Sequence, residues 1–278
     1  MNLPVTARRL FALVALAAAP AFAQAPAAAP QPAPPPTHSQ FHEPVPADFN
    51  DHDGYIQLFD GQSLAAWEGD PTYWRVENGA IVGESSTEKP ISNTYIWRKD
   101  TIAHDFDLKL EIKCELAGGS GIQYRSQTGI PWRHPQRAGL PPFNFDWMMT
   151  GPQADFWFPV NPLHASYSGQ FYSENTPLGI VAWRGEIVLS TPGAGPRLIG
   201  SVGDRDELGG YVKINDWNQY EIIARGGALI HIINGHVMAI LIDDDPASSN
   251  NKPGKIGIEL EATPAKVSVR NIWLKKLD

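Results

Sequence analysis

The stretch "DFDLKLEIKCEL" (105–116) decides the fold class, because apolar and charged residues alternate along it with a period of two. The residues on its apolar face are Phe106, Leu108, Leu110, Ile112 and Cys114. Such alternation predicts a β-strand with one buried face. No stretch of the chain shows the 3.6-residue period of an amphipathic helix for longer than a turn or two.

Two further stretches predict β-hairpins. "WRVENGAIVG" (74–83) and "LIHIINGHVMAILI" (229–242) each place an Asn-Gly pair between two apolar runs, and both residues of such a pair tolerate a positive φ. "WNQYEIIAR" (217–225) and "AKVSVRNIWLKKL" (265–277) read as additional strands. We therefore predict an all-β fold, an antiparallel two-sheet sandwich of the jelly-roll type.

Composition narrows the class of ligand. The chain has 278 residues, with 22 Lys and Arg against 30 Asp and Glu, and a formal charge of -8. A nucleic-acid-binding protein would normally carry a clustered basic surface, so we expect no nucleic-acid partner. Nine Trp, eight Tyr and eleven Phe are core material, but Trp and Tyr also stack on sugar rings and other flat ligands.

The first 47 residues predict a targeting segment and a linker. Arg8-Arg9, an apolar run from Leu10 to Ala19 and "AFA" (21–23) are typical of a signal peptide over 1–23, too short to span a bilayer. Residues 24–47 are mostly Ala, Pro and Gln and predict an extended linker. We expect one folded domain over 48–278 and no membrane span. The single cysteine, Cys114, cannot form an internal disulfide, so we expect a small buried apolar residue there.

"MTGPQADFWF" (149–158) is an apolar strand with unusual polar content. Ala154, Phe156 and Phe158 alternate along it and suit a packed sheet, whereas Gln153 and Asp155 share the opposite face. A solvated sheet face would also show a polar residue at every second place. An amide beside a carboxylate, however, is not the Lys, Thr, Ser and Glu mixture of such a face. We interpret this pair as part of a binding groove.

Three neighbouring stretches repeat the pattern of Gln, Asp, Arg, Tyr and Glu on one strand face. They are Gln123 and Arg125 in "SGIQYRS" (120–126), Gln170, Tyr172 and Glu174 in "GQFYSEN" (169–175), and Trp183, Arg184 and Glu186 in "IVAWRGEIV" (180–188). The glycines that flank these residues would let a ligand approach the backbone: Gly119, Gly121, Gly151 and Gly169. Amides, carboxylates and aromatics in one groove suit a neutral polyhydroxylated ligand.

The segment 127–148 breaks the strand pattern and is rich in Pro and Gly, with Trp132, Arg133, His134 and Arg137 inside it. Loops of this length in a compact domain are usually functional or disordered, and the aromatic content favours function. His134 is the histidine we keep as an acid/base candidate. His231 and His236 flank a predicted turn, so we expect them on the hairpin surface.

Metal and glycosidase motifs are weak. The eight histidines form no metal-binding spacing, so we expect no cofactor. "GDRDELGG" (203–210) lacks the spacing of an EF-hand loop and is best read as a solvated turn. The E-x-D-x-x-E pattern of retaining β-glucanases is also missing, and no ordinary pair of glycosidase carboxylates is evident.

The chain resembles the 3-keto-disaccharide hydrolase domain family over about residues 54–277. The segments that carry the resemblance occur in order: "GYIQLFDGQSLAAWEG", "GGSGIQYRS", "GPQADF", "GQFYSEN", "GIVAWRGEIV", "DWNQYEIIARGGALIHIINGHVMAILIDDDP" and "GKIGIEL…VSVRNIWLKKL". The resemblance implies a concanavalin/glucanase-like jelly roll and an exported bacterial protein, periplasmic or secreted, that acts on sugars oxidised at C3. Its penultimate strand reads "IELE", with Glu259 and Glu261, where the family pattern often reads "LQLH".

For such a substrate we expect elimination next to the ketone, since a C3 carbonyl acidifies the C2 hydrogen. The predicted catalytic residues are Asp155 as base and Glu174 or His134 as acid. Arg125, with Gln123 or Gln153, would stabilise the enolate oxygen, and Tyr172, Trp183 and Arg184 would bind substrate. Alternatives are a divalent metal in place of Arg125, with Asp155 and Glu174 among its ligands, a lectin-like binding module without turnover, and an interaction domain.

Overall fold

The computed structural model describes residues 48–116, 118–135, 138–157, 167–261 and 264–277. The predicted signal peptide, the linker and Phe158 lie outside these ranges. The strands are β1 Ile56–Gln57, β2 Trp67–Gly69, β3 Trp74–Glu77, β4 Ala80–Ser85, β5 Asn93–Arg98, β6 Phe106–Glu115, β7 Gly119–Thr128, β8 Met149–Trp157, β9 Phe171–Glu174, β10 Gly179–Ala182, β11 Glu186–Thr191, β12 Gly195–Ser201, β13 Asn218–Arg225, β14 Ala228–Ile233, β15 His236–Asp243, β16 Lys255–Glu261 and β17 Ala265–Lys276.

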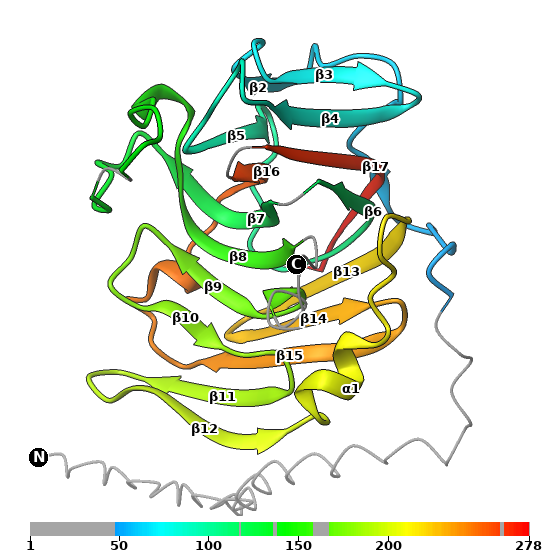
Figure 1. Cartoon of the computed structure of the whole chain (residues 1–278). Helices are drawn as coiled ribbons and strands as arrows, with labels where there is room; N and C mark the ends of the chain where they lie inside the picture. Colours follow the sequence, from blue (N-terminus) through cyan, green and yellow to red (C-terminus); the bar gives the residue numbers. More distant parts are fainter. Residues whose placement is uncertain (1–47, 117, 136–137, 158–166, 262–263, 278) are drawn as a thin grey trace, which may run out of the picture. The chain divides into compact units, whose positions relative to one another are not determined.

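Two sheets form a sandwich of the predicted jelly-roll class (Figure 1). A ten-stranded sheet runs in the order β12-β11-β15-β14-β13-β6-β17-β4-β3, with β1 paired to β17. A seven-stranded sheet runs in the order β10-β9-β8-β7-β16-β5-β2. Among the described strands, all pairings are antiparallel except that of β11 with β15, which is parallel. The seven-stranded sheet thus brings together strands from the middle and the end of the chain.

The predicted strand within residues 105–116 is confirmed. It forms β6 at the centre of the ten-stranded sheet, and its five alternate apolar residues are all buried. Both Asn-Gly pairs are confirmed as hairpin turns, with φ of 51° and 76° at Asn78 and Gly79 and of 51° and 80° at Asn234 and Gly235. Local sequence therefore predicted these elements correctly, because the alternation of a strand and the backbone conformation of a turn depend on residues that are adjacent in the chain.

The hydrophobic core lies between the two sheets. Ile122, Ala154 and Phe156 point into it from the seven-stranded sheet, and Leu108 and Ile222 belong to the same core cluster from the ten-stranded sheet. Since side chains alternate along a strand, the neighbours of these core residues on β7 and β8 must face the outer side of the seven-stranded sheet. The polar residues of the predicted groove are on that outer side.

Helical structure is sparse among the described residues. It comprises α1 Arg205–Gly209 and the 3-10 turns Phe145–Trp147 and Ser249–Asn251. The segment read as a solvated turn forms α1, whose first backbone N–H groups are capped by the Asp204 carboxylate. No helix in the described part of the chain is long and apolar enough to cross a membrane.

His231 was predicted on the hairpin surface, and this is wrong. Its side chain is fully buried between the sheets. The hydroxyl of Tyr124, on β7, lies 2.7 Å from its Nε2, and its Nδ1 lies 3.3 Å from the Gly169 carbonyl. A carbonyl only accepts, so Nδ1 carries the proton and Nε2 accepts from Tyr124. The strand is the one expected, but His231 is on its inward face.

Candidate active site

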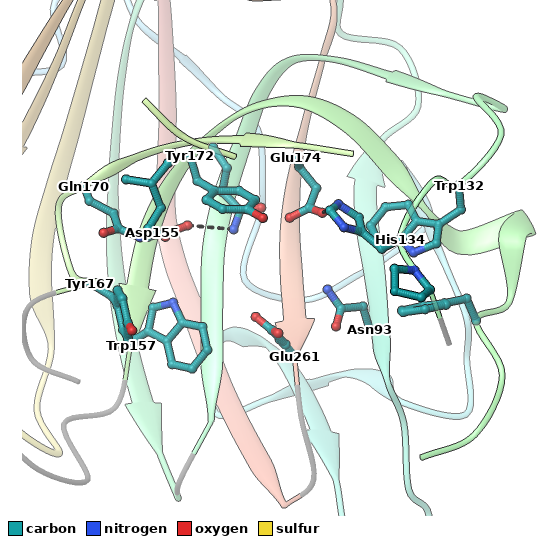
Figure 2. A pocket seen from close by; sticks show the side chains of 14 residues that line it. Asn93, Trp132, His134, Asp155, Trp157, Tyr167, Gln170, Tyr172, Glu174 and Glu261 are labelled. Carbon is teal, nitrogen blue, oxygen red and sulfur yellow. Dashed lines mark hydrogen bonds and ion pairs between the residues drawn. The ribbon is translucent and has the colours of Figure 1, made fainter. Parts of the chain in front are cut away.

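A cavity of about 500 Å³ opens over the outer face of the seven-stranded sheet (Figure 2). Its lining residues come from β5, β8, β9, β10, β16 and the connections around them. They are Asn93, Trp132, His134, Pro135, Phe143, Gln153, Asp155, Trp157, Tyr167, Gln170, Tyr172, Glu174, Ile180 and Glu261. Of the residues predicted for the site, the cavity includes Asp155, Glu174, His134, Gln153 and Tyr172.

Asp155 is a buried carboxyl in the cavity wall. Its side chain is 3% exposed. Gln153 Nε2 donates to its Oδ1 at 2.8 Å, and Gln170 Nε2 donates to its Oδ2 at 2.5 Å. Burial raises its pKa to about 7, while the two amide hydrogen bonds act in the opposite direction. Asp155 is therefore a carboxyl that changes its protonation near neutral pH, which is the property a general base needs.

A second buried carboxyl lies next to Asp155. Glu259 is fully buried; it accepts hydrogen bonds at 2.7 Å from Asn93 Nδ2 and from the Tyr95 hydroxyl, and at 2.8 Å from Gln153 Nε2. Burial and the neighbouring carboxylates raise its pKa. The Gln153 amide thus donates one N–H to each of two carboxyl groups, and it links them directly.

The opposite side of the cavity holds a histidine and a carboxylate. His134 Nε2, from the connection between β7 and β8, lies 3.7 Å from Glu174 Oε1 on β9. Figure 2 shows this pair on the far side of Tyr172 from Asp155. The pKa of Tyr172 is raised, chiefly by burial and then by Glu174, so its hydroxyl stays protonated and can donate. The cavity is therefore lined both by a proton acceptor, Asp155, and by groups that can donate a proton, Tyr172 and the His134–Glu174 pair.

Aromatic rings close both ends of the cavity. At one end the rings of Trp157 and Tyr167 lie 5.2 Å apart, and at the other the ring of Trp132 lies 5.2 Å from that of Phe143. Figure 2 shows Glu174 and Glu261 between these ends, and Asp155 beside the end formed by Trp157 and Tyr167. Flat apolar faces around hydrogen-bonding groups match a sugar ring, which has apolar C–H faces and polar edges.

The glycines of β7 make room for side chains of the site. A Cβ on Gly119 would lie 2.6 Å from the Trp157 ring, and one on Gly121 would lie 2.6 Å from the Gln153 amide. Gly121 pairs with Asp155 across the sheet. From the sequence we expect these glycines to let a ligand approach the backbone. In the structure, the side chains of Trp157 and Gln153 fill the space beside Gly119 and Gly121.

The expectation that Arg125 shares a face with Gln123 is wrong. The β7–β8 register shifts between Gln123 and Gln127, and Arg125 has φ of 50°. This bulge turns the Arg125 side chain away from the cavity. The guanidinium is fully buried among backbone carbonyls, at 2.6 Å from that of His104 and 3.0 Å from that of Asn250. Nothing in "IQYRS" marks the bulge, so strict alternation misplaced Arg125.

Three other predicted binding residues do not line this cavity. Gln123 lies beneath it and donates from Nε2 to Gln153 Oε1. Trp183 stacks on Tyr167 with ring centroids 6.0 Å apart, one layer behind the wall. Arg184 is buried and donates to the carbonyls of Ser168 and Arg205 at 3.0 and 2.7 Å. Trp183 and Arg184 border a separate recess of about 710 Å³ on β11 and β12.

Sequence reasoning assigned no role to several residues that form the site. Glu259 and Glu261 were noted only as a departure from a family pattern, and Asn93 was not noted at all. Gln170 was grouped with Tyr172 and Glu174 but given no role. The signal was present on β16, where Glu259 and Glu261 alternate with apolar residues as Gln153 and Asp155 do on β8. What sequence does not show is that β16 lies next to β7.

The described lining of the cavity is acidic. Asp155, Glu174 and Glu261 contribute to it, and no Lys or Arg is among the described residues that line it. Within the same part of the chain, no group of three or more His, Cys, Asp or Glu residues is arranged to hold a metal ion.

Fold and cavity together define a two-sheet jelly-roll protein of the glucanase- and lectin-like fold class, with a cavity over the outer face of one sheet. A "putative glycosyl hydrolase" from Parabacteroides distasonis has the same fold, with 19% identity and a TM-score of 0.50 over 84% of this chain and 99% of that one. A Bacillus subtilis protein of unknown function with a galectin-like fold matches with 12% identity and a TM-score of 0.50, over 76% of this chain and 88% of that one. No curated protein matches the sequence.

Residues 54–275 match the family model of the 3-keto-alpha-glucoside-1,2-lyase-like domain, so the chain belongs to that family. The match covers most of the described domain, including every strand that lines the cavity. The resemblance found in the sequence is thereby confirmed. The two solved structures support the fold alone. At such low identity they carry no information on the substrate.

Proposed function

We propose that this protein cleaves glycosides whose sugar ring carries a ketone at C3, by elimination and rehydration. The observation that carries the proposal is Asp155, a carboxyl with a pKa of about 7 in the wall of a cavity of about 500 Å³ with aromatic ends. A base with this pKa is half ionised at neutral pH and holds a transferred proton well. Membership in the 3-keto-alpha-glucoside-1,2-lyase-like family supports the substrate class.

Asp155 begins the reaction. The C3 carbonyl withdraws electrons from the adjacent C–H bond, so the Asp155 carboxylate can remove the C2 proton. The electron pair of that bond then moves toward C3 and forms an enolate. Tyr172 is the described neutral donor best suited to this oxygen, because its hydroxyl stays protonated and lines the same cavity. Arg125, the electrophile expected from sequence, is too far into the protein to take part.

The His134–Glu174 pair completes the cleavage. As the enolate collapses, a C1–C2 double bond forms and the C1–O bond breaks. The departing oxygen takes a proton from the pair and leaves as an alcohol or a second sugar. Water then adds across the double bond, with its proton going to C2 and its hydroxyl to C1. The net reaction is hydrolysis of the glycosidic bond.

The test is incubation of the purified protein with a 3-keto-glucoside, such as 3-keto-trehalose, while release of the second sugar is measured. We expect release by the wild-type protein, and loss of at least about 1000-fold in kcat with Asp155→Asn, since a positioned general base and its proton contribute on this order. Asp155→Asn keeps the size of the side chain. Its fold is checked by circular dichroism and thermal unfolding.

Unmodified trehalose is the matched control substrate, because it lacks the ketone that acidifies C2. Equal release from both sugars would contradict the elimination mechanism. A protein that binds the 3-keto sugar in calorimetry but releases nothing would instead be a lectin-like module, the second function that the aromatic ends of the cavity favour.

Export to the periplasm or the medium is part of the proposal, supported by the signal-peptide pattern in residues 1–23. Fractionation of cells that express the full chain tests it, with mass spectrometry of the exported protein to find its first residue. That the reaction needs no cofactor stays a prediction, which the assay after dialysis against a chelator tests.

A further inference from the structure

Gln170 has an amide oxygen that the site leaves unused. Its Nε2 donates to Asp155 Oδ2 at 2.5 Å, and its side chain is 2% exposed. Its Oε1 is buried and has no hydrogen-bond partner among the described residues. A buried acceptor without a donor is unfavourable, so such an atom in a native site needs a physical explanation.

The chemistry of Asp155 supplies that explanation. An ionised carboxylate only accepts hydrogen bonds, and Gln153 and Gln170 each donate one to it. Once Asp155 has taken a proton, one of its oxygens carries an O–H that needs an acceptor. The N–H of a neighbouring amide would then face a donor instead of an acceptor.

Only one of these two amides can exchange its ends without breaking other contacts. Gln153 Oε1 accepts from Gln123 Nε2, and Gln153 Nε2 also donates to Glu259. Both ends of the Gln153 amide are therefore fixed by buried partners. The oxygen of Gln170 is not held in this way. Since the C=O and NH₂ ends of an amide are similar in size, a half-turn of Gln170 requires little space.

We propose that Gln170 is a positioning residue that turns its amide as Asp155 takes up the substrate proton, donating N–H to the carboxylate and presenting Oε1 to the protonated acid. The inference rests on the proposed function, in which Asp155 is the base. The C2–H bond breaks, its proton forms the Asp155 O–H, and its electron pair enters the enolate. Gln170 itself is neither oxidised nor protonated.

The groups around Asp155 determine how strongly the Gln170 hydrogen bond affects its ionisation. β16 contributes Glu259 and Glu261, and β9 contributes Glu174 and the neutral Tyr172. Two further described neighbours are uncharged: β7 places Gly121 opposite Asp155, and Tyr220 on β13 donates to the Asp155 backbone carbonyl. Among the described residues, the ionised form of Asp155 therefore depends on the two amide hydrogen bonds.

Gln170→Met tests the proposal, because methionine has a similar length but neither donates nor accepts as an amide does. We expect the rising limb of kcat/KM against pH to move about one unit to higher pH, since a hydrogen bond to the ionised form is lost. We expect kcat to fall about tenfold or more while KM changes less. Gln170→Glu is the second variant; its carboxylate would share a proton with Asp155, and the limb should again move to higher pH.

Gln127→Met is the matched control. It removes a glutamine hydrogen bond, at 2.8 Å to the Pro253 carbonyl, on β7 outside the cavity. We expect its pH profile to match that of the wild type. Unchanged pH profiles and kcat in both Gln170 variants would overturn the proposal.

Direct titration separates this proposal from the proposed function. The ¹³C resonance of the Asp155 carboxyl is followed against pH in wild type and Gln170→Met, without substrate. A higher pKa in the variant supports the role of Gln170 even if no 3-keto-glycoside is cleaved, an outcome that would remove only the proposed reaction. An identical titration in both proteins refutes the role, whatever the turnover.

Discussion

At the scale of single residues, Asp155 shows how burial converts an ordinary carboxyl into a base. Its hydrogen bonds to Gln153 and Gln170 favour the ionised form, yet removal from water raises its pKa more than they lower it. The folded protein therefore binds a proton at pH values where the unfolded chain has released it. This difference makes the stability of the protein depend on pH.

The first prediction follows from the sign of that shift. Between about pH 4 and pH 7 the native state holds the Asp155 proton and the unfolded state does not, so the contribution of Asp155 to the free energy of unfolding falls as pH rises. Asp155→Asn removes this term. We expect the variant to gain stability relative to wild type by up to about 4 kcal/mol between pH 4 and pH 8. Urea unfolding across this range measures it, and a constant difference would contradict it.

At the scale of elements, β7 supports the site mainly because it carries a glycine, Gly121, where a side chain would collide with the site. Gly121 lies between Asp155 on β8 and the carboxyl-bearing strand β16, and its missing side chain leaves the space that the Gln153 amide fills. Further along the same strand, the bulge before Gln127 turns Arg125 toward backbone carbonyls. One strand thus carries the site in its first half and anchors neighbouring loops in its second.

Gly121→Ala tests the role of this empty position. A Cβ there would lie 2.6 Å from the Gln153 amide, which must move and loosen its hydrogen bonds to Asp155 and Glu259. We expect kcat/KM for the 3-keto-glucoside to fall about 10- to 100-fold, because small displacements of catalytic groups lower the reaction rate strongly. Gly200→Ala, whose Cβ would meet Ile187 at 3.3 Å on β11, is the control and should retain activity. Full activity of Gly121→Ala would rule out this role.

At the scale of the whole molecule, a buried polar contact joins the two sheets. His231 belongs to the ten-stranded sheet and accepts from Tyr124 of the seven-stranded sheet. Burial lowers the pKa of His231 to about 4. The folded state therefore keeps the imidazole neutral at pH values where the unfolded chain binds a proton.

The contribution of His231 to stability should consequently weaken in acid, opposite in sign to the contribution of Asp155 over the same range. As pH falls from about 6.5 to about 4, the unfolded state gains a proton at His231 that the native state lacks, and this contribution falls by up to about 3 kcal/mol. We expect His231→Gln to remove this contribution from the slope of stability against pH, measured by thermal unfolding. Tyr124→Phe should lower stability by about 1 kcal/mol through one lost hydrogen bond and leave the slope intact. Equal slopes in wild type and His231→Gln would contradict the prediction.

Features that depend on near neighbours in the chain were predictable. Alternation identified β6, β8 and β17, the Asn-Gly pairs located two hairpins, and Gln153 with Asp155 marked a strand whose outer face is polar. Each of these follows from period-two geometry or from backbone freedom, which the residues themselves determine. Membership in the family followed from the order of such segments.

The tertiary structure alone decided which of these residues meet. Strand order places Glu259 near Asp155, although they are far apart in the chain, because β16 inserts between β7 and β5. A bulge took Arg125 out of the site, and burial gave Asp155 a pKa near 7. Sequence by itself specifies local periodicity, whereas proximity and desolvation exist only once distant strands have paired.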